Sequence, residues 1–88
     1  MKRINQLVIA LLMVVGLFAN AADRVNVNRA DAETLAEVLD GIGISRARAI
    51  VEYRKSFGPF EDPYDLANVK GVGLKTIEAN EAKIDIGD

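Results

Sequence analysis

Apolar residues recur at helical spacing in separate stretches of the chain. The spacing of three and four residues predicts amphipathic helices over 32–39, 45–57 and 74–82, and a further helix opening at Pro63. Each helix is expected to bury one face against the others. The inward residues are expected to be Leu35, Val38, Leu39, Ala47, Ile50, Val51, Phe57, Tyr64, Leu66, Val69, Leu74 and Ile77, with Phe60 filling the core as well. Four to five short helices of this kind indicate an all-α fold.

Residues at the ends of these stretches are ones that begin and stop helices. Asp31 and Asp62 each stand where an N-cap is needed, and Pro63 then occupies the first helical position, where its missing N–H has no consequence. Gly58 and Pro59 end the second helix, because glycine supports the C-terminal turn and proline cannot continue it.

A five-residue segment recurs after thirty positions, as Leu-Asp-Gly-Ile-Gly at 39–43 and Val-Lys-Gly-Val-Gly at 69–73. Glycines two positions apart predict a tight turn through positive φ, and the apolar residue between them is expected to point into the core. Each unit is therefore predicted to be a helix, a hairpin and a helix. In this alignment Asn80 falls opposite Ile50, and its polar side chain predicts partial exposure.

Short segments at both ends of the helical region alternate apolar and polar residues, which is typical of extended chain. These segments are 25–28 and 84–86. We expect the second to pack beside Val25 and Val27.

The geometry of each hairpin favours phosphate binding. The turn leaves the first amides of the next helix unpaired and directed outward, and the positive end of the helix dipole adds to them. Two such sites indicate a protein that grips a sugar-phosphate backbone. Contacts are expected from backbone amides and from nearby cations and hydroxyls. The candidate DNA-binding residues are Gly41, Gly43, Ser45, Arg46, Lys70, Gly71, Gly73, Lys75 and Thr76, with Arg48, Arg54 and Lys55 as weaker candidates.

The first 21 residues have the layout of a secretory signal peptide. Lys2 and Arg3 precede an uncharged apolar run over 7–19, and small residues at 19–21 suit cleavage after Ala21. Thirteen helical residues span roughly 20 Å, less than the roughly 30 Å hydrocarbon core, so an uncleaved membrane tether is the weaker alternative. A periplasmic protein without stable membrane insertion is therefore expected.

Composition limits how the protein could bind or react. The chain holds 11 basic and 13 acidic residues, and without Lys2 and Arg3 the balance becomes 9 against 13, a net charge of −4. DNA binding must then depend on a few placed cations, with strong salt dependence. Cysteine and histidine are both absent. Their absence excludes disulfides and thiol chemistry, and removes the commonest general base and metal ligand. We expect no enzyme activity, no cofactor and no metal.

Several motifs taken together resemble the DNA-binding domain of the ComEA family of competence DNA receptors. They are Val-Asn-Val-Asn-Arg-Ala at 25–30, the hairpin at 39–43, Ile-Val-Glu-Tyr-Arg at 50–54, Gly-Pro-Phe at 58–60, Asp-Leu at 65–66 and Val-Lys-Gly-Val-Gly-Leu-Lys-Thr at 69–76. The resemblance covers 24–86. It implies a tandem helix-hairpin-helix domain that binds double-stranded DNA without sequence preference, and a role in DNA uptake during natural transformation. It also implies the short periplasmic form of the family.

The helix pattern and the repeat set the expected domain boundaries. The chain departs from the family pattern at two residues and in the first helix, which reaches its hairpin through 35–39, one residue longer than the commonest spacing. We predict a signal peptide over 1–21, an extended lead-in over 22–30, helix-hairpin-helix units over 31–57 and 63–84 joined by a connector over 58–62, and a tail over 85–88. Asp40 stands where proline or lysine is more usual, and Glu81 where a basic residue is frequent. An acidic side chain beside the first hairpin is expected to weaken phosphate binding there.

Two other classes of function compete with DNA binding. Helical hairpin pairs also serve as docking units, and the acidic charge suits an exported protein-interaction module. Similar hairpins accompany nucleases and ligases, but the acidic residues here are scattered and no nucleophile stands beside a base.

For DNA binding, four or five engaged phosphates predict a slope of log K against log salt of about −4. DNA-uptake proteins are further expected partners, and self-association on DNA is left open.

Overall fold

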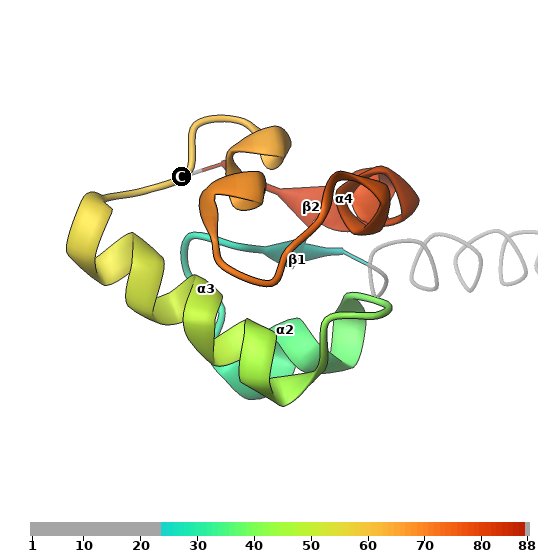
Figure 1. Cartoon of the computed structure of the whole chain (residues 1–88), viewed down its shortest axis with the longest axis horizontal. Helices are drawn as coiled ribbons and strands as arrows, with labels where there is room; N and C mark the ends of the chain where they lie inside the picture. Colours follow the sequence, from blue (N-terminus) through green and yellow to red (C-terminus); the bar gives the residue numbers. More distant parts are fainter. Residues whose placement is uncertain (1–23, 88) are drawn as a thin grey trace, which may run out of the picture.

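The protein is mostly helical, as the sequence predicted. The computed structural model describes residues 24–87, so the expected signal peptide lies outside the described residues. The elements in chain order are β1 (Val25–Asn26), α2 (Ala32–Val38), α3 (Gly43–Phe57), the 3₁₀ helix η1 (Pro63–Asn68), α4 (Leu74–Asn80), the 3₁₀ helix η2 (Glu81–Lys83) and β2 (Ile84–Asp85). Helix, hairpin and helix follow one another twice, which confirms the all-α fold class (Figure 1).

The predicted helix starts at Asp31 and Asp62 are confirmed. The Asp31 Oδ1 accepts a hydrogen bond from the Thr34 backbone N–H at 2.8 Å, and α2 begins at the next residue. The Asp62 Oδ1 accepts from the Tyr64 N–H at 2.8 Å. The helix that follows Asp62 is 3₁₀ rather than α, and its six residues make it long for a 3₁₀ helix.

The ends of the other two helices differ by a few residues from the sequence prediction. Helix α3 begins at Gly43, two positions before the predicted start at Ser45. It ends at Phe57 as predicted, and Gly58 follows as its C-cap with φ +96°. Helix α4 ends at Asn80, and the last turn of the predicted helix becomes η2. A tightened final turn of this kind is common at helix C-termini.

The two ends of the described chain pair as parallel strands, whereas the sequence predicted only that 84–86 packs beside Val25 and Val27. Val25 is opposite Ile84 and Asn26 is opposite Asp85, and the Val27 N–H donates to the Asp85 carbonyl at 3.0 Å. The Asn28 side chain extends this contact, because its Nδ2 donates to the carbonyls of Phe60 at 2.9 Å and Ile86 at 3.2 Å. Both ends and the connector are therefore held together.

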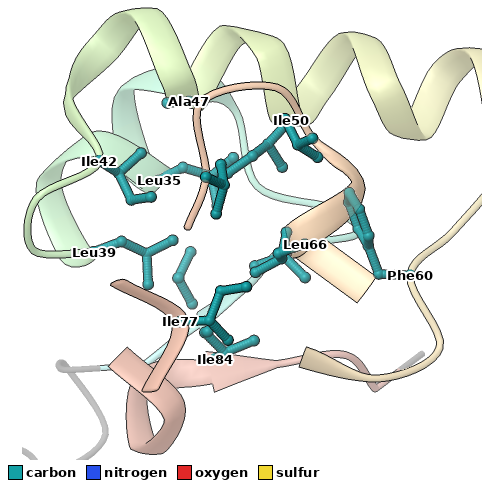
Figure 2. Close-up of a cluster of buried hydrophobic side chains, with 13 residues drawn as sticks. Leu35, Leu39, Ile42, Ala47, Ile50, Phe60, Leu66, Ile77 and Ile84 are labelled. Carbon is teal, nitrogen blue, oxygen red and sulfur yellow. The ribbon is translucent and has the colours of Figure 1, made fainter. Parts of the chain in front are cut away.

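One apolar core lies between the two units (Figure 2). The residues that the hairpins direct inward, Ile42 and Val72, are both buried, as predicted. The buried apolar side chains are Val25, Val27, Leu35, Leu39, Ile42, Ala47, Ile50, Phe60, Leu66, Val69, Val72, Ile77 and Ile84.

Three apolar residues that the sequence placed in the core are exposed instead. Phe57 is 75% exposed, Leu74 59% and Tyr64 41%. Phe57 and Leu74 are terminal residues of α3 and α4, where the helix face no longer lies over the core. The Phe57 ring instead contacts Tyr53, one turn earlier, with centroids 4.7 Å apart. Phe60 is buried, as expected. Its ring stacks on the same Tyr53 ring, with centroids 5.4 Å apart.

Candidate nucleic-acid interface

The two hairpins share a sequence pattern but not one backbone conformation. Gly41, Gly43 and Gly71 have φ of +76°, +69° and +92°, which confirms the predicted left-handed turns at these positions. The same prediction was wrong for Gly73, which has φ −96°. Gly73 is the N-cap of α4, and extended backbone is the usual conformation of that position. Gly73 is therefore not required for its conformation.

The helices that follow the hairpins begin without a side-chain cap. Ile42 precedes α3 and Gly73 precedes α4, and neither makes a side-chain hydrogen bond to the helix start. Neither helix has an acidic residue in its first turn, whereas α2 and η1 each have an aspartate cap and an acidic first turn. The first amides of α3 and α4 thus lack the side-chain oxygen that α2 and η1 supply. An anion bound there would not compete with a carboxylate.

A groove between α3 and the second hairpin brings together candidates from both repeats. It is lined by Ser45, Arg46 and Ala49 of α3 and by Lys70 and Gly71 of the second hairpin. The Arg46 Nε donates to the Gly71 carbonyl at 2.7 Å, so the guanidinium lies across the groove. Two cations and a hydroxyl thus line the groove, and none of its lining residues is acidic. This combination suits a phosphate oxygen.

Two further predicted residues, Lys75 and Thr76, lie outside the groove lining, in α4. Lys75 is exposed in the first turn of α4, whereas Thr76 is half-buried. Among the weaker candidates, Arg54 donates to the Val27 carbonyl at 2.9 Å, which gives it a structural role. Lys55 lies 3.9 Å from Glu52 on the exposed face of α3. The groove and the start of α4 therefore hold the cations best placed for phosphate.

Sequence reasoning also placed Asn80 wrongly. Partial exposure was expected, but Asn80 is only 2% exposed. Its Oδ1 accepts from the Asp40 N–H at 2.8 Å, and its Nδ2 donates to the carbonyls of Asp40 at 2.8 Å and Thr76 at 2.9 Å. Asn80 therefore binds the backbone at the entry to the first hairpin. The only sequence signal was a polar residue at the position equivalent to Ile50.

The charge of Asp40 is paired in the structure. The Lys83 Nζ lies 2.7 Å from the Asp40 Oδ2, while the Asp40 side chain remains 77% exposed. The predicted weakening of the first hairpin by this carboxylate is therefore partly offset by a neighbouring cation.

Three acidic residues surround Tyr64. Partial desolvation raises the pKa of the Tyr64 hydroxyl, and the negative charges of Glu81, Glu78 and Asp62 raise it further. These carboxylates belong to η2, α4 and the cap of η1. None of the three lines the cationic groove.

Two other kinds of site were sought within residues 24–87. No group of three or more acidic, histidine or cysteine side chains in this range is placed to hold a metal ion. Within the same range, no helix combines the length and the apolar character needed to cross a bilayer.

Comparison with known proteins identifies the motif to which this geometry corresponds. Residues 20–85 match the family model described as the helix-hairpin-helix motif. An uncharacterized protein of Haemophilus influenzae is 39% identical over 66 residues. ComE operon protein 1 of Bacillus subtilis is 37% identical over 62 residues, and human endonuclease/exonuclease/phosphatase family domain-containing protein 1 is 45% identical over 56 residues.

These relatives are longer than the part that matches. The matches cover 75%, 70% and 64% of this chain but 59%, 30% and 10% of the three relatives, in the same order. No solved structure matches the chain.

Proposed function

We propose that this chain, which belongs to the helix-hairpin-helix family and carries a ComEA-like domain, binds double-stranded DNA. It would bind through backbone phosphates and without regard to base sequence. The observation that carries this proposal is the contrast between helix starts. Asp31 and Asp62 cap the helices that do not follow hairpins, whereas α3 and α4 begin without a side-chain cap. The groove between α3 and the second hairpin has no acidic lining residue.

Phosphate oxygens would bind where these features meet. The amides that open α3 and α4 donate to one phosphate at each hairpin, and Arg46, Lys70 and Lys75 supply the charge. Ser45 adds a hydroxyl at the groove. Such contacts hold the duplex backbone and carry no sequence information.

The biological role we propose is the binding of incoming DNA during natural transformation. Support comes from the similarity to ComE operon protein 1, which covers 70% of this chain. The signal-peptide pattern of residues 1–21 favours a periplasmic site of action, with an uncleaved tether as the alternative. In this role the domain is non-catalytic and hands DNA to other proteins of the uptake machinery.

DNA binding is tested on protein expressed from the full chain and purified in the form that the cells yield. Fluorescence anisotropy with several unrelated 20-base-pair duplexes should give equal affinities, with Kd of roughly 10⁻⁶ to 10⁻⁴ M near physiological salt and a salt slope of about −4. Lys75→Gln should weaken binding and reduce the slope by about 0.9. Lys55→Gln is the matched control, because Lys55 lies on the exposed face of α3 beside Glu52, and it should leave both values unchanged.

Absence of binding to every duplex at low salt would remove the proposed function. A protein-interaction module would then be the better hypothesis, and the exposed Phe57 with Tyr53 would be the first surface to examine. The proposed location has its own test, because N-terminal sequencing of the mature protein separates cleavage after Ala21 from an intact tether. Loss of DNA uptake on deletion of the gene would support the role in transformation.

A further inference from the structure

Each helix-hairpin-helix unit holds the hairpin of the other through polar side chains. Asn80, at the end of α4 in the second unit, binds the N–H and the carbonyl of Asp40 at the first hairpin, each at 2.8 Å. Arg46, in α3 of the first unit, donates to the carbonyl of Gly71 in the second hairpin at 2.7 Å. The two links run in opposite directions between the units.

We propose that Asn80 and Arg46 are positioning residues that fix the two hairpins at the separation needed to bind phosphates of one duplex together. This inference rests on the proposed function and extends it. It adds Asn80, which makes no phosphate contact, and gives Arg46 a second role besides supplying charge. Asn80 is buried and has no access to DNA, so it acts through the backbone of Asp40. Arg46 acts through the carbonyl of Gly71 and also presents a cation to the groove.

Asparagine is the residue type that the first link requires. The backbone of Asp40 presents a donor and an acceptor together, and a side-chain amide can satisfy both at once. An aspartate at position 80 could not donate to the carbonyl, and an apolar residue could do neither. Ile50, at the equivalent position of the first unit, is fully buried and apolar, so the second hairpin is held by Arg46 instead.

Fixed separation matters because two weak sites gain affinity only when both bind at the same time. Once one hairpin holds a phosphate, the second binding event is intramolecular, and its probability depends on geometry. Hairpins already held in place lose less conformational freedom on binding. A protein with an acidic overall charge cannot rely on its general field for this gain.

The first test compares Asn80→Leu with Val27→Ala. Val27 is fully buried outside both hairpins, so its truncation lowers stability without touching Asp40. Both variants are measured at a temperature where circular dichroism shows each at least 95% folded. Asn80→Leu should weaken duplex binding about tenfold and reduce the magnitude of the salt slope by about 0.9, because the phosphate at the first hairpin is lost. Val27→Ala should bind with wild-type affinity and slope.

Hydrogen exchange of the Asp40 amide gives a readout without DNA. In Asn80→Leu this amide should exchange at least about tenfold faster than in Val27→Ala, since its hydrogen bond to the Asn80 Oδ1 is gone.

The second test uses Arg46→Lys, which keeps the charge but removes the planar Nε donor. Arg29→Lys, at an exposed arginine outside both hairpins, is its control. Arg46→Lys should weaken duplex binding severalfold, and Arg29→Lys should not. Without DNA, the Val72 amide, which follows Gly71 and donates to the Val69 carbonyl, should also exchange faster in Arg46→Lys than in Arg29→Lys. Faster exchange separates positioning from the loss of a direct phosphate contact, and it decides the inference even where Asn80→Leu does not fold.

The outcomes separate the inference from the proposed function. If wild-type protein binds DNA while Asn80→Leu and Arg46→Lys match their controls in affinity and slope, the positioning role is wrong and the proposed function stands. If wild-type protein binds no DNA, the proposed function fails and this inference fails with it.

Discussion

The glycines of the second hairpin have different roles at the level of the single residue. Gly71 has φ +92°, and an added Cβ would lie 3.3 Å from the Arg46 Nε, whereas Gly73 has φ −96° and open space where a Cβ would stand. Gly71→Ala should therefore lower the free energy of unfolding by about 1–2 kcal/mol. Gly73→Ala should lower it by about 0.5 kcal/mol, because alanine is a poorer N-cap than glycine while the backbone conformation at this position suits any residue. Urea denaturation of both variants measures the difference, and equal losses would contradict the assignment.

The two phenylalanines that flank Gly58 differ in the same way. Phe60 is 3% exposed and Phe57 is 75% exposed. Phe60→Leu should lower the free energy of unfolding by about 1–2 kcal/mol, because it leaves a gap in the core. Phe57→Leu should stay within about 0.5 kcal/mol of wild type. A loss at Phe57 as large as that at Phe60 would mean that its contact with Tyr53 contributes more than its exposure indicates.

Residues whose neighbours come from distant parts of the chain were the hardest to predict. The two phenylalanines flank the same break at Gly58 and Pro59, and the sequence placed both inside, yet α3 extends past the core at Phe57. Asn80 depends on a partner forty positions away, the backbone of Asp40. Nothing in the sequence near Asn80 predicts that partner. Tertiary contacts of this kind override the local pattern.

Elements were predicted better than single residues, because their signals are local. The aspartate caps, the proline that opens η1 and the repeated glycine pattern are each contained in a few neighbouring residues. The repeat therefore predicted both hairpins and most of the candidate site. The 3₁₀ form of η1 was missed, since periodicity over six residues cannot separate 3.0 from 3.6 residues per turn. The sequence did not predict that one groove would be lined by Ser45, Arg46, Lys70 and Gly71, because this arrangement depends on how the two units pack together.

The cap of α2 should make part of the stability depend on pH. Hydrogen bonds from Thr34, first from its side chain and then from its backbone, hold the pKa of the Asp31 carboxyl below its ordinary value of 3.8. A depressed pKa stabilises the folded state above the unfolded value, and that contribution is lost as the pH falls through the folded value. Asp31→Asn keeps an acceptor for the Thr34 N–H but does not titrate.

Wild type should therefore melt at a higher temperature than Asp31→Asn at neutral pH. The difference should shrink below pH 3.8 and vanish once the carboxyl of the folded protein is protonated. Thermal melts across this range measure it. A difference that stayed constant with pH would assign the effect to something other than the charge of Asp31.

At the scale of the whole molecule, the domain has to bind a polyanion while carrying net negative charge. The chain has 13 acidic against 11 basic residues, yet no acidic residue lines the groove and Lys83 pairs with Asp40 at the first hairpin. Charge is therefore sorted by position, and the acidic residues outside the hairpins act on DNA only through the long-range field. That field reaches about 30 Å at 0.01 M salt but about 8 Å at 0.15 M.

Removing acidic charge outside the hairpins should therefore help binding only at low salt. Glu33 in α2 and Glu61 in the connector are both exposed. The double substitution Glu33→Gln and Glu61→Gln should tighten duplex binding roughly twofold to fivefold at 0.01 M salt and change it little at 0.15 M, because screening removes the repulsion. Lys75→Gln should differ, since a direct phosphate contact weakens binding at both salt concentrations. An equal gain from the double substitution at 0.15 M would mean that these carboxylates touch the duplex, and the DNA-binding surface would then extend beyond the two hairpins.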